Sequence, residues 1–267
     1  MAILTISREI GSGGREIGYK IADLMGYELI TKERLLSDIK EWGAKWENWG
    51  KILDEHHPTV WEKYDWSFKG FCALMQNQML QYALKDKVVL LGRGGNFLFN
   101  DIPYALRIRI IAPVKYRAER IMKRDSVDIE TARWIIEKTD KERSGFIRAL
   151  YGEDLNALSE YDITFDTSTR PLEGIIASVK AALADKERFN TPNNCEKLRL
   201  HALAAKIKAV ILTDPTFFIP TLDIDDDGEG LILKGVIHNP KEHKRIEDTV
   251  QKLAGDTKVR CKLHYRS

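Results

Sequence analysis

The sequence predicts an α/β protein with a doubly wound, mostly parallel sheet, followed by a small separate α+β domain. A short β-rich run at 2–7 ends in a glycine-rich turn at 11–14 and leads into a helix at 16–25, which is the opening of a βαβ unit. The continuous apolar run at 87–91 is typical of a strand buried on both faces of a parallel sheet. A polar segment at 189–195, with one proline and three asparagines, then indicates a linker.

The composition limits the class of protein. The chain has 267 residues, of which 43% are hydrophobic and 31% charged, so it can build a core and is not a disordered chain. Its formal net charge of +2 gives no strong bulk attraction to nucleic acid, and we expect no nucleic-acid partner. Cys72, Cys195 and Cys261 are scattered, which argues against a disulfide framework and favours a cytoplasmic location. No run approaches the ~20 apolar residues of a membrane span.

The first predicted domain, residues 1–188, takes its elements from the spacing of its apolar residues. Ile17 and Ile21 recur at helical spacing after the glycine-rich turn. Residues 32–85 are predicted to be a mostly helical insert, and their five tryptophans are more typical of packing than of base stacking. The other expected elements are a short strand within 26–30, strands at 87–91, 106–112 and 162–166, and helices at 115–125, 126–149 and 171–186. This order is that of a doubly wound α/β domain.

The second predicted domain, residues 196–267, contains a hairpin signal. Asp226–Gly228 lies between two alternating runs at 221–225 and 231–237, and an Asp-Gly pair at such a place predicts a β-hairpin. A helix is expected before the hairpin at 196–212, and a helix at 241–253 and a strand at 258–264 are expected after it. The order α-β-β-α-β makes a small but viable α+β unit.

The glycine-rich turn after the first strand is a candidate anion site. Backbone N–H groups and the partial positive charge of a helix N-terminus favour phosphate there, and glycine lets the backbone approach closely. The full pattern G-x-x-x-x-G-K-[ST] is not present. Arg8 stands in the place of its first glycine, Gly14 in that of the lysine and Glu16 in that of the magnesium-binding hydroxyl. Arg8, Arg15 or arginines from elsewhere would then neutralise the phosphate; a purely structural turn is the alternative.

The full amino-acid sequence of this segment is more informative than the number of its glycines. Thr5–Gly18 closely resembles the opening of the cytidylate-kinase-like family, relatives of bacterial cytidylate kinase. Four later segments resemble further family motifs in the same order: Leu91–Gly95, Arg117–Arg120, Asp140–Arg143 and Tyr161–Ser168. The resemblance covers about residues 2–185 and implies a P-loop-type sheet with a helical insert and a lid.

The resemblance also implies an activity, phosphoryl transfer from ATP with Mg²⁺ to CMP or dCMP. Arginines suit such chemistry because they bind phosphate oxygens in bidentate fashion. Arg93 would contact the acceptor phosphate, and Arg143, with Arg120 and Arg124 as weaker candidates, would close over the transferring group. The predicted catalytic residues are Arg93, Arg143 and Arg15, and the predicted cofactor-binding residues are Arg8, Gly11, Ser12, Gly13, Gly14, Arg15 and Glu16. No protein ligand for the metal is assigned, and Mg²⁺ can be held largely by phosphates and water.

The C-terminal unit resembles the BON domain, on the segments 205–209, 223–225 and 235–237. BON domains are commonly associated with phospholipids or small ligands, so the resemblance implies a sensing or docking module. Two alternatives to a kinase remain open. The missing lysine favours a non-catalytic nucleotide- or anion-binding regulatory module. A third hypothesis is an interaction protein that uses the tryptophan-rich insert.

Overall fold

The computed structural model describes residues 2–55, 58–59, 65–226 and 228–265. The chain divides into two compact units. The first unit consists of Met1–Leu35, Ile52–Pro58 and Lys85–Asn194, and the second unit consists of Leu36–Lys51, Thr59–Leu84 and Cys195–Ser267. Each unit is considered by itself below.

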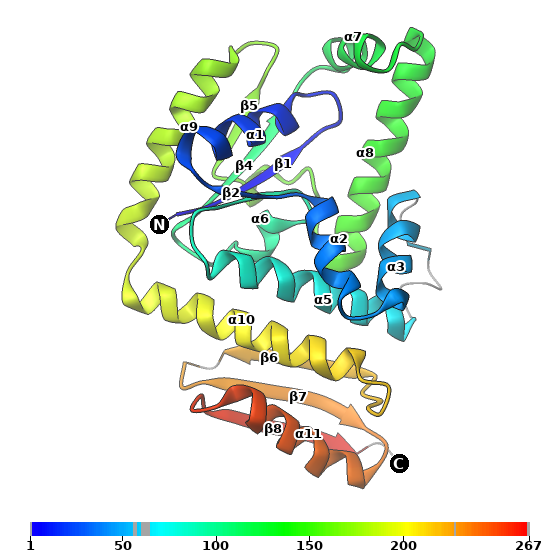
Figure 1. Ribbon diagram of the computed structural model, residues 1–267, viewed down its shortest axis with the longest axis vertical. Coiled ribbons are helices and arrows are strands. Elements are labelled where there is room, and N and C mark those ends of the chain that lie inside the picture. Colours follow the sequence, from blue (N-terminus) through cyan, green and yellow to red (C-terminus); the bar gives the residue numbers. More distant parts are fainter. Residues whose placement is uncertain (1, 56–57, 60–64, 227, 266–267) are drawn as a thin grey trace. The chain divides into compact units, whose positions relative to one another are not determined.

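A five-stranded parallel sheet forms the centre of the first unit (Figure 1). Its strands are β1 (Ile3–Arg8), β2 (Glu28–Ile30), β3 (Val88–Leu91), β4 (Ala105–Ile111) and β5 (Ile163–Asp166). Their order across the sheet is β2-β3-β1-β4-β5. The strands β1 and β3 lie in the interior of the sheet and are almost entirely buried, which is why their sequences are continuous apolar runs. The predicted doubly wound α/β fold is confirmed.

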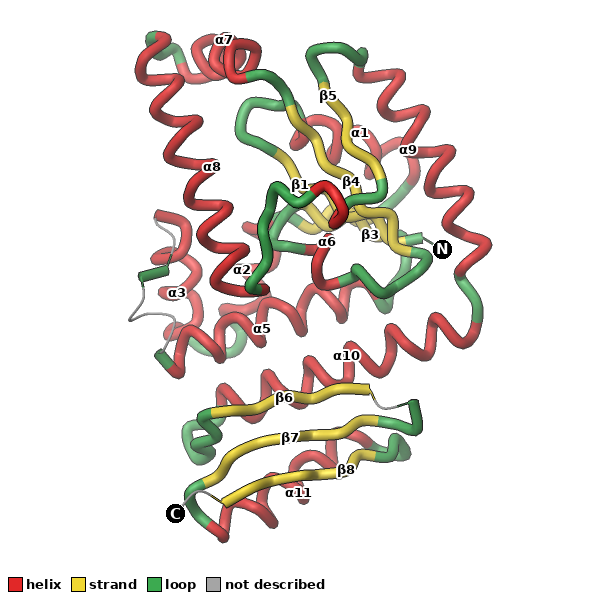
Figure 2. The backbone as a smooth tube through the Cα atoms, turned by 180° about the vertical axis from the view of Figure 1, so that it is seen from behind, coloured by secondary structure: helices red, strands yellow, loops and turns green. Residues whose placement is uncertain are grey.

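Helices pack around this sheet. The helix α1 (Gly14–Met25) contacts β1 and β3, and it meets α9 (Leu172–Lys186), which also contacts β4. Ile17, Ile21 and Ile175 bury their side chains against the sheet in one apolar core. Gly26 ends α1 in the left-handed conformation, as expected for a glycine between helix and strand. Figure 2 shows the strands of the sheet from the opposite side, with the short helix α6 (Gly95–Leu98) beside β1 and β4.

Two further helices form a hairpin at one end of the first unit. The helices α7 (Val114–Asp125) and α8 (Ile129–Tyr151) pack together through a small apolar cluster of Ala118, Ile121, Ala132 and Ile136. The sequence predicts both helices, at 115–125 and 126–149, and the structure confirms them. They correspond to the helix and lid segments of the family resemblance.

The second unit contains helices α5 (Trp66–Ala83), α10 (Pro192–Thr213) and α11 (Pro240–Ala254). Its strands are β6 (Thr221–Asp226), β7 (Leu231–Ile237) and β8 (Val259–Tyr265), with β6 antiparallel and β8 parallel to β7. The predicted order α-β-β-α-β is therefore present, and the hairpin lies where the Asp-Gly pair predicted it; Asp227 in its turn lies outside the described residues.

The insert forms the helices α2 (Lys32–Lys40), α3 (Ala44–Glu55) and α5 within its described part. Trp46 and Trp49 are buried, and Trp49 packs on Phe68 with ring centroids 5.8 Å apart. Trp46 and Trp49 thus agree with a packing role, whereas Trp42 is exposed and Trp61 lies outside the described residues. No described helix is both long and apolar enough to cross a membrane.

The predicted linker at 189–195 is partly helical. The helix α10 begins at Pro192 rather than at the predicted 196. Thr191 caps it, because its hydroxyl accepts a hydrogen bond from the Asn194 amide at 3.3 Å, and proline is favoured in a first helical turn. The division into domains 1–188 and 196–267 stays a prediction.

Candidate functional site

The loop between β1 and α1 depends on its glycines. Gly11 and Gly13 have φ angles of 77° and 86°, a region that side chains rarely adopt. A side chain on Gly14 would place its Cβ 2.5 Å from the Cβ of Arg8. Gly13 caps α1 without a side-chain hydrogen bond, so the first N–H groups of the helix stay available to an anion.

Ser12 has a different place from its glycine neighbours. Its hydroxyl is fully buried and lies 2.9 Å from the Glu9 carbonyl oxygen and 3.1 Å from that of Ile110. The Thr167 hydroxyl donates to the Ser12 carbonyl at 2.8 Å. Ser12 therefore fixes the loop to β4 and the end of β5, and it does not line the cavity described next.

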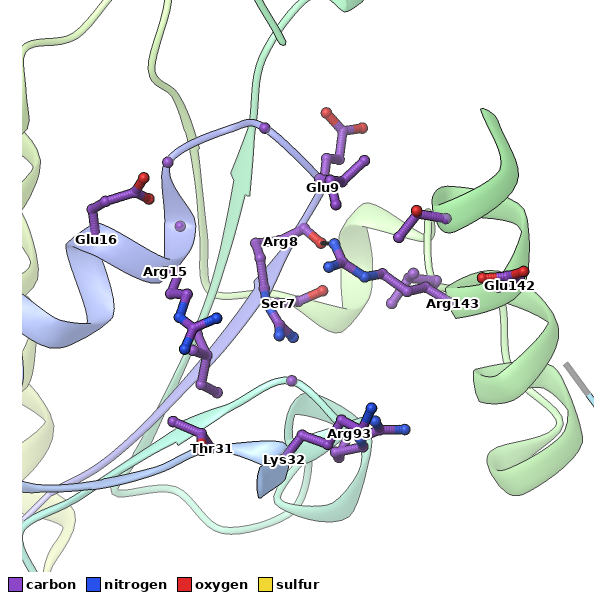
Figure 3. A pocket seen from close by; sticks show the side chains of 18 of the residues that line it. Ser7, Arg8, Glu9, Arg15, Glu16, Thr31, Lys32, Arg93, Glu142 and Arg143 are labelled. Atoms are coloured by element: carbon purple, nitrogen blue, oxygen red, sulfur yellow. Dashed lines mark hydrogen bonds between the residues drawn. The ribbon is translucent and has the colours of Figure 1, made fainter. Parts of the chain in front are cut away.

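A cavity of about 920 Å³ opens beside this loop, within the first unit. It lies at the carboxyl ends of the strands, where open α/β sheets bind their ligands. The described residues that line it carry many charges and include no tryptophan. The basic ones are Arg8, Arg15, Lys32, Arg93, Arg120, Lys123, Arg124 and Arg143, and the acidic ones are Glu9, Glu16, Glu33 and Glu142. The excess of basic groups favours an anionic ligand (Figure 3).

Arg8 and Arg93 lie at the base of the cavity. Arg8 is the last residue of β1, and its guanidinium lies against Gly92, whose φ of 85° favours glycine at that position. Within the described part of the chain, no carboxylate pairs with either guanidinium within 4.0 Å. Two half-buried cations with no carboxylate at ion-pair distance among the described residues form a site that an anion can complete.

The backbone at Arg93 is strained. Its φ angle is 56°, between the left-handed Gly92 and Gly94. The Tyr151 hydroxyl donates to the Arg93 carbonyl at 3.0 Å, and the Arg93 guanidinium lies 5.0 Å from the centre of the Phe146 ring. Strain that surrounding contacts maintain at a cavity is typical of functional positions.

The basic groups of the cavity lower one another's pKa values. Burial, followed by the charges of Arg143 and Arg93, lowers the pKa of Arg8 to about 9. Burial and then Arg143 lower the pKa of Arg93 to about 10, and burial and then Arg93 lower the pKa of Lys32 to about 8. The site therefore disfavours its own positive charge, and a bound anion would relieve this cost.

Arg143 reaches the cavity from α8 (Figure 3). Its Nη1 donates to the Arg8 carbonyl at 2.9 Å, and burial lowers its pKa. Arg15 is exposed at the opening, where its guanidinium lies 5.6 Å from the centre of the Tyr19 ring. The structure thus brings Arg8, Arg15, Arg93 and Arg143 to one cavity.

Glu16, at the place of the magnesium-binding hydroxyl, is also at this cavity. Its carboxylate pairs with Arg120 at 3.3 Å, and both side chains are exposed. Arg120 lies against Gly13, where a Cβ would be 3.2 Å from its guanidinium. Among the described residues, no group of three or more His, Cys, Asp or Glu side chains is arranged to hold a metal.

An ion-pair network joins the loop to both helices of the hairpin. Arg117, buried on α7, pairs with Asp140 of α8 at 2.5 Å and lies 3.5 Å from Glu9. Arg117 Nη1 also donates to the Ile10 carbonyl at 3.2 Å, and Asp140 accepts from the Ile10 amide at 3.2 Å. Sequence reasoning did not assign these roles. One available signal was the position of Arg117 four residues before buried Ile121, on the apolar side of its helix.

Lys32 was also missed. It is the first residue of α2 and follows β2 by two positions. Open α/β sheets bind ligands at the carboxyl ends of their strands, so the position of Lys32 in the sequence is a signal of the same kind as that of Arg93.

Comparison with known proteins gives a consistent set of similarities. Residues 3–169 match the Cytidylate kinase-like family. The chain is 30% identical over 182 residues to a protein named cytidylate kinase from Pyrococcus horikoshii, covering 68% of this chain and 88% of that one. It is 29% identical over 185 residues to another of that name from Methanocaldococcus jannaschii, covering 68% and 97%. A crystal structure of an uncharacterized protein from Eubacterium ventriosum has a similar fold, with a TM-score of 0.54 at 19% identity, covering 69% and 99% of the two chains.

Proposed function

The chain belongs to the cytidylate kinase-like family, and from this we propose that it transfers a phosphoryl group from ATP to a nucleoside monophosphate, CMP or dCMP. The observation that carries the proposal is the pair of guanidinium groups, Arg8 and Arg93, which have no carboxylate within 4.0 Å in the described part of the chain and lie beside a glycine-rich helix N-terminus. Two anionic groups must meet in such a reaction, and a cavity rich in arginine lowers their repulsion.

The proposal gives each group a role. Arg93, with Arg8 next to it, holds the acceptor phosphate. The N–H groups of the loop and Arg15 hold the phosphates of ATP. Arg143 neutralises the transferring group, since a guanidinium has five N–H donors and one bond to the Arg8 carbonyl leaves others free for phosphate. These residues position and neutralise, which is most of what a protein contributes to phosphoryl transfer.

ATP would arrive as its magnesium complex. Glu16 is the nearest counterpart of the usual protein ligand, but its carboxylate is paired with Arg120. The described residues therefore do not form a complete magnesium site, and the ion would keep mostly phosphate and water ligands. No step assigned above depends on a protein-bound metal.

The test is a kinase assay on the purified chain with ATP, Mg²⁺ and a panel of CMP, dCMP, UMP and AMP. We expect ADP formation with CMP and dCMP, and a loss of kcat/KM of at least about 100-fold in Arg93→Gln and Arg143→Gln. Arg133→Gln is the matched control, because Arg133 lies on α8 but is exposed and does not line the cavity. No turnover with any monophosphate, together with unchanged nucleotide binding by Arg93→Gln, would contradict the proposal.

A second candidate is a nucleotide- or anion-binding regulatory module without turnover. Gly14 in place of the lysine and the Glu16–Arg120 pair favour it. In this case ATP or CMP would raise the melting temperature without forming ADP. The C-terminal BON-like domain would then sense a lipid or small ligand, or dock to it. A cytoplasmic location is part of both proposals.

A further inference from the structure

We propose that Lys32 is a third ligand of the acceptor phosphate and that Lys32, Arg8 and Arg93 form one subsite for a phosphomonoester dianion. The inference rests on the proposed function and deepens it. It names a residue outside the glycine-rich loop and outside the family motifs found in the sequence. It also specifies the charge state of the ligand.

The topology of the sheet places the three cations together. The strands β2, β3 and β1 are consecutive neighbours, with Ile30 paired to Leu90 and Leu90 paired to Thr5. Because the strands are parallel, their carboxyl ends meet at one edge. Arg8 ends β1, and Lys32 and Arg93 each follow their strand by two residues. All three side chains line the same cavity (Figure 3).

The charges around Lys32 come from every element at this edge. Lys32 is half-buried, and Arg93 and Arg8 are basic groups close enough to oppose its charge. Glu33, the next residue of α2, acts in the other direction but is exposed. Among the described residues, the other charged groups that line this cavity are Arg15 and Glu16 from α1, Glu9 from the loop, Arg120, Lys123 and Arg124 from α7, and Glu142 and Arg143 from α8. Lys32 is thus a half-buried cation with two guanidinium groups close enough to lower its pKa.

This arrangement predicts a link between binding and protonation. In the free protein, burial and Arg93 lower the pKa of Lys32 to about 8, so its charge is present below pH 8 and is lost above it. A phosphate dianion beside Lys32 favours the charged form and raises that pKa. Binding near pH 8 therefore takes up a proton.

The pH dependence of affinity follows from the same groups. A phosphomonoester loses its second proton near pH ~6, so the dianion is present above that value. Affinity is expected to be highest between pH ~6 and pH 8 and to fall on the alkaline side as Lys32 becomes neutral. Arg8 and Arg93 keep their charge over this range, because a guanidinium group stays protonated in proteins.

The experiment is titration calorimetry on the full chain with CMP, cytidine and inorganic phosphate as probes, at pH 7 and pH 8.5. Lys32→Gln is expected to weaken CMP and phosphate at least about tenfold and to leave cytidine unchanged, because one charge-assisted contact is removed. Lys32→Arg is expected to bind CMP at pH 7 and to keep its affinity at pH 8.5, where the wild type weakens. Lys180→Gln, an exposed lysine of α9, is the control and should match the wild type throughout.

Proton uptake gives an independent readout. Calorimetry at pH 8 in two buffers of different ionisation enthalpy should show uptake on CMP binding by the wild type and none by Lys32→Gln. A folded Lys32→Gln that binds CMP and phosphate as the wild type does, while Arg93→Gln does not, would overturn the role of Lys32 and leave the proposed function standing. Phosphate binding that depends on Lys32, without binding of any nucleotide, would keep the subsite and reject the proposed function. Absence of phosphate and CMP binding in the wild type would reject both.

Discussion

Arg93 joins a left-handed backbone to a guanidinium that lies over an aromatic ring. A non-glycine residue in this conformation costs on the order of 1–2 kcal/mol. The bond from the Tyr151 hydroxyl and the ring of Phe146 hold the residue there. In this strained conformation the Arg93 side chain lines the cavity.

Arg93→Gly is therefore expected to weaken CMP binding while leaving the stability of the fold nearly unchanged. Glycine adopts φ of 56° without strain, which offsets the greater freedom it gives the unfolded chain. The free energy of unfolding in urea should stay within about 1 kcal/mol of the wild type. CMP binding, measured by calorimetry, should fall at least about tenfold. A variant that binds CMP normally would show that the Arg93 guanidinium does not hold the ligand.

Arg117 connects the loop, α7 and α8 through charges that are mostly buried. Arg117→Met is expected to lower the free energy of unfolding by about 3 kcal/mol, because Glu9 and Asp140 would each lose a partner in a half-buried place. Urea denaturation measures this. Arg124→Met is the control on the same helix. Arg124 pairs with its exposed neighbour Asp125, and removing such a pair should cost less than about 1 kcal/mol. Equal losses in the two variants would contradict the role given to Arg117.

Two helical glycines, one packed and one exposed, test how closely their helices are covered by neighbouring atoms. Gly70 of α5 faces the Trp46 ring, which would lie 2.7 Å from an added Cβ, and the Leu212 carbonyl of α10 at 3.1 Å. Gly70→Ala should therefore destabilise by about 1–3 kcal/mol. Gly174 of α9 is exposed and would meet only Pro171, at 3.6 Å. Gly174→Ala should stabilise by about 0.5–1 kcal/mol. Thermal and urea unfolding of both variants check the opposite signs.

The elements could be predicted because their signals are local. The apolar run of β3, the glycine turn before α1 and the Asp-Gly pair of the hairpin each act within a few residues. The spacing of Arg117 from Ile121 could indicate only that Arg117 lies on the apolar side of its helix, because its ion pairs depend on how α7 meets α8 and on the position of Glu9. The start of α10 at Pro192 was missed because the polar composition of 189–195 outweighed the cap formed by Thr191. The gathering of four predicted arginines at one cavity followed from motif order, but Lys32 has no motif.

The second unit combines segments of the helical insert with the C-terminal part of the chain, which bears on the domain organisation. Twelve of the eighteen residues of α5 are buried, on all sides of the helix, so α5 needs a cover over its whole surface. Within this unit, α5 contacts the C-terminal segment: Lys69 Nζ donates to the Pro220 carbonyl at 3.1 Å, and Gly70 approaches Leu212. The insert and the C-terminal segment are thus grouped together although more than a hundred residues separate them in sequence.

A chain that ends at residue 194 tests this grouping. We expect it to expose α5, to bind a hydrophobic dye such as ANS and to melt at a lower temperature than the full chain. The domain division predicted from the sequence gives a different result, in which residues 1–188 fold fully without 196–267. If the truncated chain binds no more dye than the full chain and melts at the same temperature, the result would support that division.

The contacts of α8 with the loop determine how a ligand reaches the cavity. Asp140 holds the Ile10 amide and Arg143 holds the Arg8 carbonyl, so this helix and the loop are fastened at two points one helical turn apart. Moving α8 away from the loop would break both hydrogen bonds, and moving α7 with it would also separate Arg117 from the Ile10 carbonyl and from Glu9. We therefore expect the loop and α8 to keep this arrangement when a nucleotide binds, so that binding orders little of the protein. Its association rate should be governed by diffusion into the opening and by ionic strength, with no slow rearrangement of the base of α8.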